Sequence, residues 1–177
     1  MDLKLIYLSL LLFLIIQRLS ELFLSRSNEK YMLRNGAKVG PNKDLIFMIL
    51  IHTSWLAYCS FYALNKSSWQ ETPFYIGLAL LLIGQLFRLT AILTLGRNWS
   101  VKVISVPHFK RVKKGIFKYF RHPNYIGVIL EIFALPLMLN SLIAAFVFSL
   151  LNGILLNYRI KHEEFFLLKV KQDEGSL

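Results

Sequence analysis

The sequence predicts an all-α integral membrane protein, and three observations support this prediction. Of the 177 residues, 55% are hydrophobic and only 18% are charged, whereas soluble domains carry about a quarter charged residues. The mean hydropathy is +0.50. Apolar runs long enough to cross a bilayer recur along the chain, and Lys and Arg gather in alternate connecting segments. We therefore expect a single membrane domain over residues 1–177.

Five apolar segments are predicted to span the membrane as helices, because a crossing helix needs about 20 mostly apolar residues. The predicted spans are residues 3–24, 45–64, 73–95, 125–139 and 141–158. The last two share one apolar run that is too long for a single crossing. Pro136 interrupts this run, and Asn140 and Ser141 are residues typical of a turn or a helix cap. We expect a tight helical hairpin there, with a short fourth span.

Basic residues lie almost entirely on one side of the predicted helices. The first and third connecting segments and the tail after residue 158 hold most of them, whereas Lys4 and Lys66 lie on the other side. The positive-inside rule then predicts an external N-terminus and a cytosolic C-terminus in a multi-pass protein, with the cytoplasmic membrane as its expected location. The net charge of +11 is explained by this topology and by attraction to anionic headgroups, so we expect no nucleic-acid partner.

The basic segment at residues 96–124 is interleaved with aromatic and branched apolar side chains. A solvated connector would not need them. Two interpretations remain open. The segment could lie as an amphipathic stretch at headgroup depth, or it could fold, together with residues 159–177, into a cap over the cytosolic mouth of the bundle and close a ligand pocket.

Two groups of polar residues at the predicted cytosolic side could form a site. Pro123 suits the first turn of a helix, whose free N–H groups attract negative or lone-pair-rich groups, and Arg121 and His122 flank that position. Arg159 and Glu163 are four residues apart and should share a helical face. They could form a weak surface ion pair. Alternatively, Arg159 could bind an anionic substrate group while Glu163 accepts hydrogen bonds from a ligand.

Charged residues also occur within the predicted spans. Arg18, Glu21 and Arg88 could extend toward the interface or pair with one another inside the bundle. Glu131 falls in the middle of the short fourth span, where an unpaired carboxylate is costly, and Arg88 is its candidate partner.

Several kinds of chemistry have no signature in the sequence. There is no phosphate-binding loop, no dinucleotide glycine fingerprint and no spacing of metal ligands. Cys59 is the only cysteine, and no nucleophile is paired with a base. If the chain is an enzyme, we expect it to use neither a metal nor a covalent intermediate.

Two stretches resemble the isoprenylcysteine carboxyl methyltransferase family, namely residues 112–127 (VKKGIFKYFRHPNYIG) and residues 159–164 (RIKHEE). The resemblance covers the C-terminal half. Residues 17–30 and 96–99 look closest to small bacterial members, some of which are similar to enzymes that methylate lipophilic polyketides. The resemblance implies S-adenosylmethionine-dependent methyl transfer to a carboxylate or hydroxyl oxygen of a lipophilic or prenylated substrate that enters from the bilayer.

The resemblance also implies roles for individual residues. The positions that match cofactor contacts of the family are Phe109, Lys110, Arg111, Val112, Phe117, His122, Pro123, Asn124, Tyr125 and Glu163. Arg159 matches the position that addresses the substrate, and His122 is the candidate base for a phenol or enol. The chain departs from the family at Phe109, where His is common, and at Phe117, where an aromatic hydroxyl is common, so no particular side-chain contact is implied at either.

Two other functions are compatible with the sequence. Some NADPH-dependent sterol-type membrane reductases resemble the same C-terminal half and would show a nicotinamide requirement. A non-enzymatic membrane adaptor with a basic aromatic loop would show no saturable cofactor binding.

Overall fold

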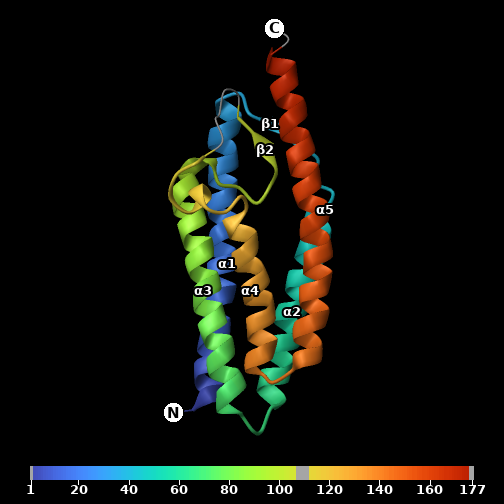
Figure 1. Cartoon of the computed structure of the whole chain (residues 1–177). Coiled ribbons are helices and arrows are strands. Elements are labelled where there is room, and N and C mark those ends of the chain that lie inside the picture. The colour runs from blue at the N-terminus through green and yellow to red at the C-terminus, as the bar shows by residue number, and fades with distance from the viewer. Residues whose placement is uncertain (1, 107–111, 176–177) are drawn as a thin grey trace.

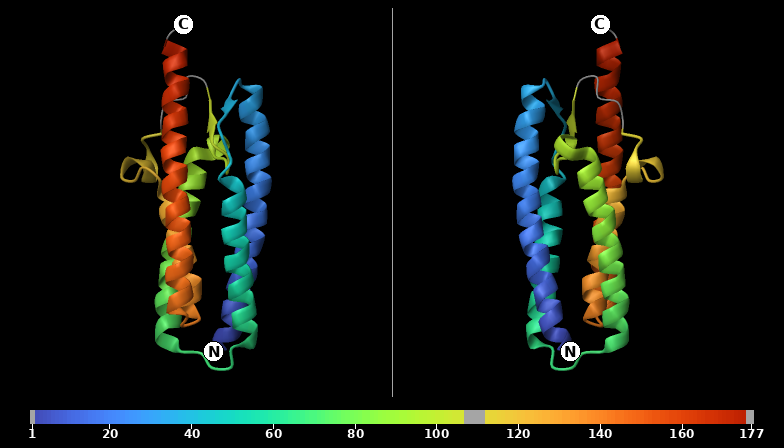
Figure 2. Two further views of the ribbon diagram at one scale, coloured as in Figure 1. Left: turned by 90° about the vertical axis from the view of Figure 1, so that its right-hand side faces the viewer. Right: turned by 90° about the vertical axis from the view of Figure 1, so that its left-hand side faces the viewer.

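The computed structural model describes residues 2–106 and 112–175, with side chains through Val170. The helices of this part of the chain are α1 (Leu3–Arg34), α2 (Leu45–Asn65), α3 (Glu71–Leu95), α4 (Pro123–Met138) and α5 (Leu142–Gly175). They form an elongated bundle with the two termini at opposite ends (Figure 1). Figure 2 shows α1 and α2 on one side of this bundle and α3, α4 and α5 on the other.

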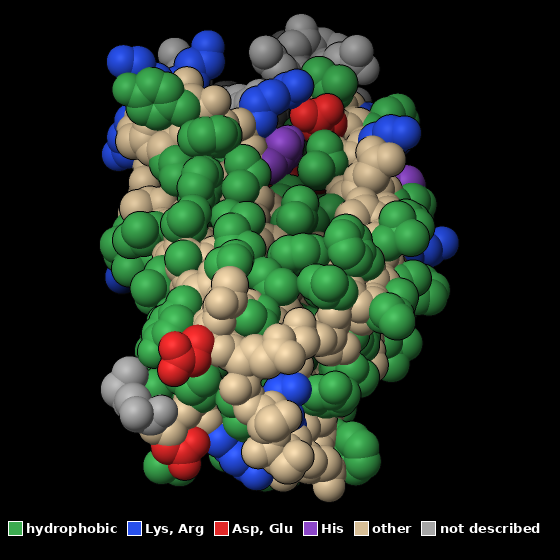
Figure 3. All heavy atoms as spheres, turned by 60° about the horizontal axis from the view of Figure 1, so that its bottom comes forward, with side chains coloured by type: hydrophobic (Ala, Val, Ile, Leu, Met, Phe, Trp, Pro, Cys, Tyr) green, Lys and Arg blue, Asp and Glu red, His purple; other side chains and the backbone are tan. Residues whose placement is uncertain are grey.

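The prediction of an all-α membrane protein is confirmed. Among the described residues, α1, α2, α3 and α5 are long and apolar enough to cross a membrane, whereas α4 is a shorter apolar helix, as expected. Hydrophobic side chains cover most of the face seen in Figure 3. The bounds of α2 and α3 agree with the predicted spans within two residues.

The first and last helices run well beyond their predicted spans. α1 continues to Arg34 and α5 continues to Gly175. Their polar outer turns contain no proline, and α1 stops only at Asn35 and Gly36, where Gly36 takes a φ of 78°. Residues 159–175, part of the tail that the sequence analysis considered for a cap, are thus helical turns of α5.

The α4–α5 hairpin forms as predicted, and Pro136 lies inside α4, as it does within the predicted span 125–139. The helix continues to Met138, and the chain turns at Asn140, which adopts a left-handed φ of 55°. The Ser141 N–H then donates to the carbonyl of Pro136 at 2.9 Å. An asparagine tolerates this conformation better than most residues, which explains why the turn occurs there.

α3 and α4 approach closely because glycines face each other between them. A Cβ atom on Gly84 would lie 2.9 Å from the carbonyl oxygen of Gly127, and one on Gly127 would lie 2.5 Å from Cγ of Arg88. Small residues are the usual means of close helix packing in membranes.

The charged residues of the spans pair inside the bundle. The Arg88 Nε atom lies 2.9 Å from Glu131 Oε1, which confirms the predicted partner. Arg88 also contacts Glu21, and Arg18 lies 2.5 Å from Glu131. Gln85 donates to the same Glu131 carboxylate at 2.8 Å. Mutual pairing, not extension toward the interface, therefore accounts for these residues, and it ties α1, α3 and α4 together.

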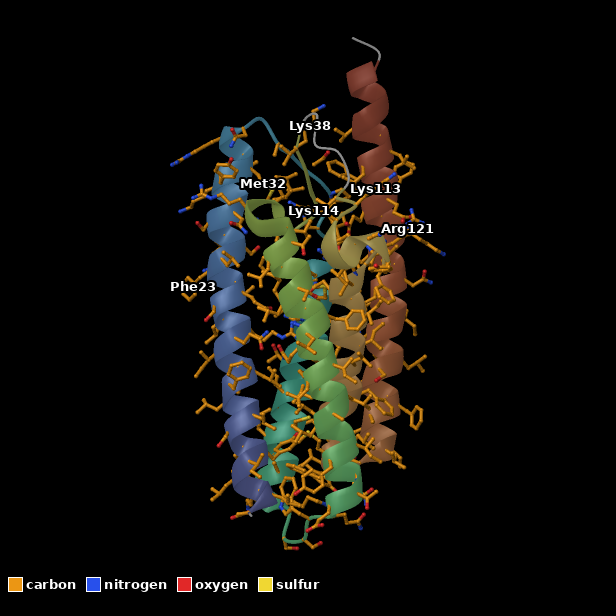
Figure 4. The ribbon with its side chains drawn as sticks, turned by 60° about the vertical axis from the view of Figure 1, so that its left-hand side comes forward. Phe23, Met32, Lys38, Lys113, Lys114 and Arg121 are labelled. Atoms are coloured by element: carbon orange, nitrogen blue, oxygen red, sulfur yellow. The ribbon has the colours of Figure 1, made fainter. Side chains whose placement is uncertain are left out.

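The end of the bundle where α1 ends and α4 begins carries the basic connecting segments, and we call it the basic end. Figure 4 shows Lys38, Lys113, Lys114 and Arg121 there, whereas Phe23 points outward from α1 lower down. Two short strands, β1 (Lys38–Val39) and β2 (Ile104–Ser105), pair antiparallel across it. Two 3-10 helices, η1 (Gly96–Asn98) and η2 (Gly115–Lys118), flank β2 in sequence.

Buried contacts anchor residues 96–106 to the rest of the bundle. Asn28 of α1 donates to the carbonyl of Trp99 at 2.8 Å, and the Val103 N–H donates to Asn42 at 3.0 Å. The Trp99 and Val103 side chains are buried. This part of the segment is therefore folded onto the end of α1 and onto the connection that precedes α2.

Candidate functional site

The candidate site lies where α4 begins and α5 leaves the apolar part of the bundle. α4 starts at Pro123, as predicted, with His122 as its N-cap residue. α5 passes this point with the segment that contains Arg159, Glu163 and Glu164. Residues nearly 40 positions apart in sequence are thus brought together by the hairpin.

Tyr125 connects the two residues of α5 that the sequence analysis paired. The Arg159 Nε–H donates to the Tyr125 hydroxyl at 3.0 Å, and that hydroxyl donates to Glu163 Oε2 at 2.8 Å. Arg159 and Glu163 do share a helical face, but no direct ion pair joins them within the described residues. The tyrosine couples the residue expected to address the substrate to a residue expected to contact the cofactor.

The Arg159 guanidinium is buried and held on all three nitrogens. Its side chain is 4% exposed, and Nη1 lies 2.5 Å from Asp44 Oδ2. Nη2 donates to the Val101 carbonyl. An arginine fixed by planar, charge-assisted bonds has one orientation, so this side chain is rigid before any ligand binds.

Asp44 is a site residue that sequence reasoning missed. An Asp immediately before a helix is normally interpreted as a cap for that helix. Asp44 does occupy the N-cap position of α2, yet its side chain makes no capping hydrogen bond. Only the position of Arg159 in space reveals its partner, because the two residues are 115 positions apart.

A second group of contacts surrounds His122. Its ring stacks on Tyr125 with centroids 5.4 Å apart and planes 13° from parallel. Its Nε2 atom lies 3.5 Å from Glu164 Oε1, and Arg121 lies 3.0 Å from the same oxygen. The structure therefore joins Arg121 and His122 to α5, through Glu164.

Two buried polar atoms of this site have no hydrogen-bond partner among the residues that the structure describes. They are Nε2 of His122 and Oδ1 of Asn124. Leaving such a group unpaired costs about 1–3 kcal/mol, so native structures rarely do so without a reason. A ligand with N–H or O–H donors would satisfy Asn124, as the amino and hydroxyl groups of S-adenosylmethionine can. In this respect the residues present fit the cofactor that the resemblance implies.

The remaining predicted cofactor positions take no part in the hydrogen bonds described above. Phe117 lies in η2 beside an open hollow of about 370 Å³ that Lys113 and Arg121 also line. Val112 is half-buried, and Pro123 is buried at the start of α4. Phe109, Lys110 and Arg111 lie outside the described residues.

These features define a helical integral membrane protein with a buried polar site at the basic end of its bundle. Residues 76–169 match the model of the isoprenylcysteine carboxyl methyltransferase (ICMT) family. The chain belongs to this family. The matched segment contains His122, Asn124, Tyr125, Arg159 and Glu163, whereas Asp44 precedes it.

Similar proteins occur in bacteria and plants. An uncharacterized protein of Bacillus subtilis (strain 168), YpbQ, is 34% identical over 160 residues, which cover 88% of this chain and 92% of that protein. Protein-S-isoprenylcysteine O-methyltransferase B of Arabidopsis thaliana is 30% identical over 68% of this chain and 61% of its own length. The A form of the same plant is 30% identical over 58% and 52%. The chain thus spans less than two thirds of either plant protein. Membership of the ICMT family supports the conclusion that this protein is an enzyme.

Proposed function

We propose that this protein is an S-adenosylmethionine-dependent methyltransferase that methylates a carboxylate or hydroxyl oxygen of a lipophilic acceptor in the membrane. The proposal rests on two hydrogen bonds, from Arg159 to the Tyr125 hydroxyl and from that hydroxyl to Glu163. They join a cationic group suited to an acceptor with a carboxylate suited to a cofactor, and all three residues fall within the segment that matches the family.

Glu163, Asn124 and His122 would hold the cofactor, with Pro123, Val112 and Phe117 beside them. When bound, S-adenosylmethionine supplies a methyl group on a positively charged sulfonium. The carboxylates of Glu163 and Glu164 favour a cationic ligand at this position. Asn124 Oδ1, which is buried and free of partners within the described chain, accepts a hydrogen bond from an amino or hydroxyl donor.

Methyl transfer to oxygen requires alignment and the exclusion of water more than acid–base help. The buried, fixed guanidinium of Arg159 and the Tyr125 hydroxyl provide a rigid edge against which an acceptor can be oriented. A carboxylate acceptor needs no base. A phenol or enol benefits from one, and the candidate is His122, whose Nε2 lies 3.5 Å from Glu164 Oε1.

The dimensions of α4 support access from the bilayer. Its 16 residues span about 24 Å at 1.5 Å per residue, less than the hydrocarbon core of about 30 Å. The start of α4, and the site with it, would then lie at or just inside one interface. We assign that interface to the cytosolic side, with the N-terminus outside, because the basic segments gather there.

Calorimetric titration of the purified protein with S-adenosylhomocysteine, and separately with NADPH, tests the proposal. We expect saturable binding of S-adenosylhomocysteine and a loss of affinity of about tenfold or more in Glu163→Gln, the cost of removing one charged contact. Glu29→Gln is the matched control, because Glu29 is a paired carboxylate of the same end, 2.7 Å from Lys102, outside the site. Binding of NADPH alone would indicate a reductase, and binding of neither ligand would indicate an adaptor.

A further inference from the structure

The Asp44 carboxylate pairs with Arg159 and does not cap the helix that Asp44 precedes. The residue sits at the N-cap of α2 without a capping bond, although capping typically contributes about 1 kcal/mol. Its side chain is as buried as that of Arg159, at 4% exposed, and the two groups are 2.5 Å apart. A buried charge pair of this kind is costly unless both members are satisfied. The chain therefore forgoes a cap to keep a negative charge on Arg159.

This pairing changes the electrostatic character of the site. The Arg159 guanidinium contacts Asp44 on one nitrogen and, through the Tyr125 hydroxyl, is linked to Glu163 on another. Its positive charge is thus already balanced by a protein carboxylate. An acceptor carboxylate that approached Arg159 would have to lie beside Asp44 and near Glu163, and like charges so placed repel.

We propose that Asp44 determines acceptor selectivity, turning the site away from carboxylates and toward acceptors with a neutral hydroxyl, such as a phenol or an enol. This inference rests on the proposed function and narrows it to one acceptor class. Asp44 acts through Arg159, as a positioning residue, and needs no contact with the acceptor itself.

A hydroxyl acceptor must lose its proton, and the site has a group placed to take it. The acceptor oxygen forms a bond to the methyl carbon, and the methyl–sulfur bond breaks with its electron pair left on sulfur. The acceptor proton passes to Nε2 of His122. That nitrogen is buried and unpartnered within the described part of the chain, and Glu164 lies 3.5 Å from it. A carboxylate acceptor would have no use for this arrangement.

The test compares two lipophilic probes of different charge. N-acetyl-S-farnesylcysteine offers a carboxylate, and 4-dodecylphenol offers a hydroxyl. Methyl transfer from S-adenosylmethionine with a labelled methyl group is measured in lipid nanodiscs, and probe binding is measured by calorimetry in the presence of S-adenosylhomocysteine. For the wild-type protein we expect kcat/KM to favour the phenol by about tenfold or more, which corresponds to one like-charge contact at the site.

Asp44→Asn keeps the shape of the side chain and removes its charge. We expect the ratio of kcat/KM for the two probes to move toward the carboxylate by about tenfold or more, and the carboxylate probe to bind more tightly. The Kd for S-adenosylhomocysteine should stay within about twofold, since Asp44 lies outside the proposed cofactor contacts. Glu29→Gln, which also removes one carboxylate, half-buried and paired with Lys102, from the basic end, should leave the ratio unchanged.

Two results would overturn the proposal. A wild-type preference for the carboxylate probe would do so regardless of how any variant folds. The proposal would also fail if Asp44→Asn lowered the melting temperature but left the ratio of kcat/KM for the two probes unchanged. Asp44 would then only stabilise the packing of α2 against α5. Failure of the wild-type protein to bind S-adenosylhomocysteine at all is a separate outcome, which refutes the methyltransferase function itself.

Discussion

Trp55 donates its indole N–H to the carbonyl oxygen of Ile132 at 3.1 Å, and that carbonyl is the one that Pro136 leaves without a partner in α4. An α-helical carbonyl normally accepts from the N–H four residues later, and proline has none. In an apolar environment the free carbonyl would be expensive. The tryptophan of α2 thus makes the proline of α4 tolerable and fixes α2 against the hairpin.

Replacing this tryptophan should destabilise the bundle. Trp55→Phe keeps most of the buried ring but removes the donor, and we expect a loss of about 1 kcal/mol in unfolding free energy. Unfolding in mixed micelles with increasing denaturing detergent would measure it. Trp69→Phe is the control, because the Trp69 indole nitrogen has no hydrogen-bond partner in residues 2–106 and 112–170. An equal loss in both variants would contradict the role assigned to Trp55.

Arg88 and Glu131 should be far more sensitive than any surface pair. Arg88→Met leaves the fully buried Glu131 carboxylate with only Arg18 and Gln85, and removal of one member of a buried pair typically costs about 3–5 kcal/mol. We expect poor yield or a large drop in melting temperature in detergent. The double variant Arg88→Met/Glu131→Met should recover part of this loss, since it removes both charges. If the double variant recovered no stability, charge balance alone would not explain the role of the Arg88–Glu131 pair.

Much of this architecture could be predicted from the sequence, because the bilayer imposes a simple rule on helix length. The spans, the hairpin and the Arg88–Glu131 pair all follow from the cost of polar groups in hydrocarbon. The outer turns of α1 and α5 did not follow, since helix continuation in water depends on local propensity and on the position of the first stop signal. The hydropathy of a span gives no information about local helix propensity or about the position of that stop signal.

The site could be predicted only where its residues are close in sequence. His122, Pro123 and Asn124 form one motif, and Arg159 and Glu163 one helical face. The role of Tyr125 as a bridge between the latter two depends on how the hairpin aligns α4 with α5. The role of Asp44 could not be predicted, because an Asp just before a helix is normally interpreted as its cap. Nothing in the local sequence indicates a partner on α5.

The Tyr125 hydroxyl should matter for catalysis more than for folding. Tyr125→Phe removes both the bond from Arg159 and the bond to Glu163, while the ring stack on His122 is retained. We expect kcat/KM for methyl transfer to fall by about tenfold or more, as hydrogen bonds to charged groups are worth about 1.5–3 kcal/mol. The melting temperature should fall only modestly, because the buried Arg159 Nε–H loses its acceptor while the other two guanidinium nitrogens keep theirs. Tyr119→Phe, on an exposed side chain of the same end, is the matched control.

Arg159→Ala should separate acceptor chemistry from cofactor binding. We expect turnover to be lost while S-adenosylhomocysteine still binds, because Glu163 and Asn124 remain in place. The variant also leaves Asp44 as an unpaired buried carboxylate, so it should be studied beside Arg159→Ala/Asp44→Asn, which removes that burden. If cofactor affinity collapsed equally in both variants, the division of roles between Arg159 and Glu163 would be wrong.

The orientation of the bundle can be tested with single cysteines. Cys59 is the only cysteine of the chain, so Cys59→Ser gives a background without reactive thiols. In that background, Lys66→Cys lies in the short connection between α2 and α3, and Lys113→Cys lies at the basic end (Figure 4). We expect a membrane-impermeant maleimide to label Lys66→Cys in intact cells and Lys113→Cys only after the membrane is opened, since basic segments stay in the cytosol. The reverse pattern would place the site on the outside, away from the cytosolic supply of S-adenosylmethionine that the proposed reaction consumes.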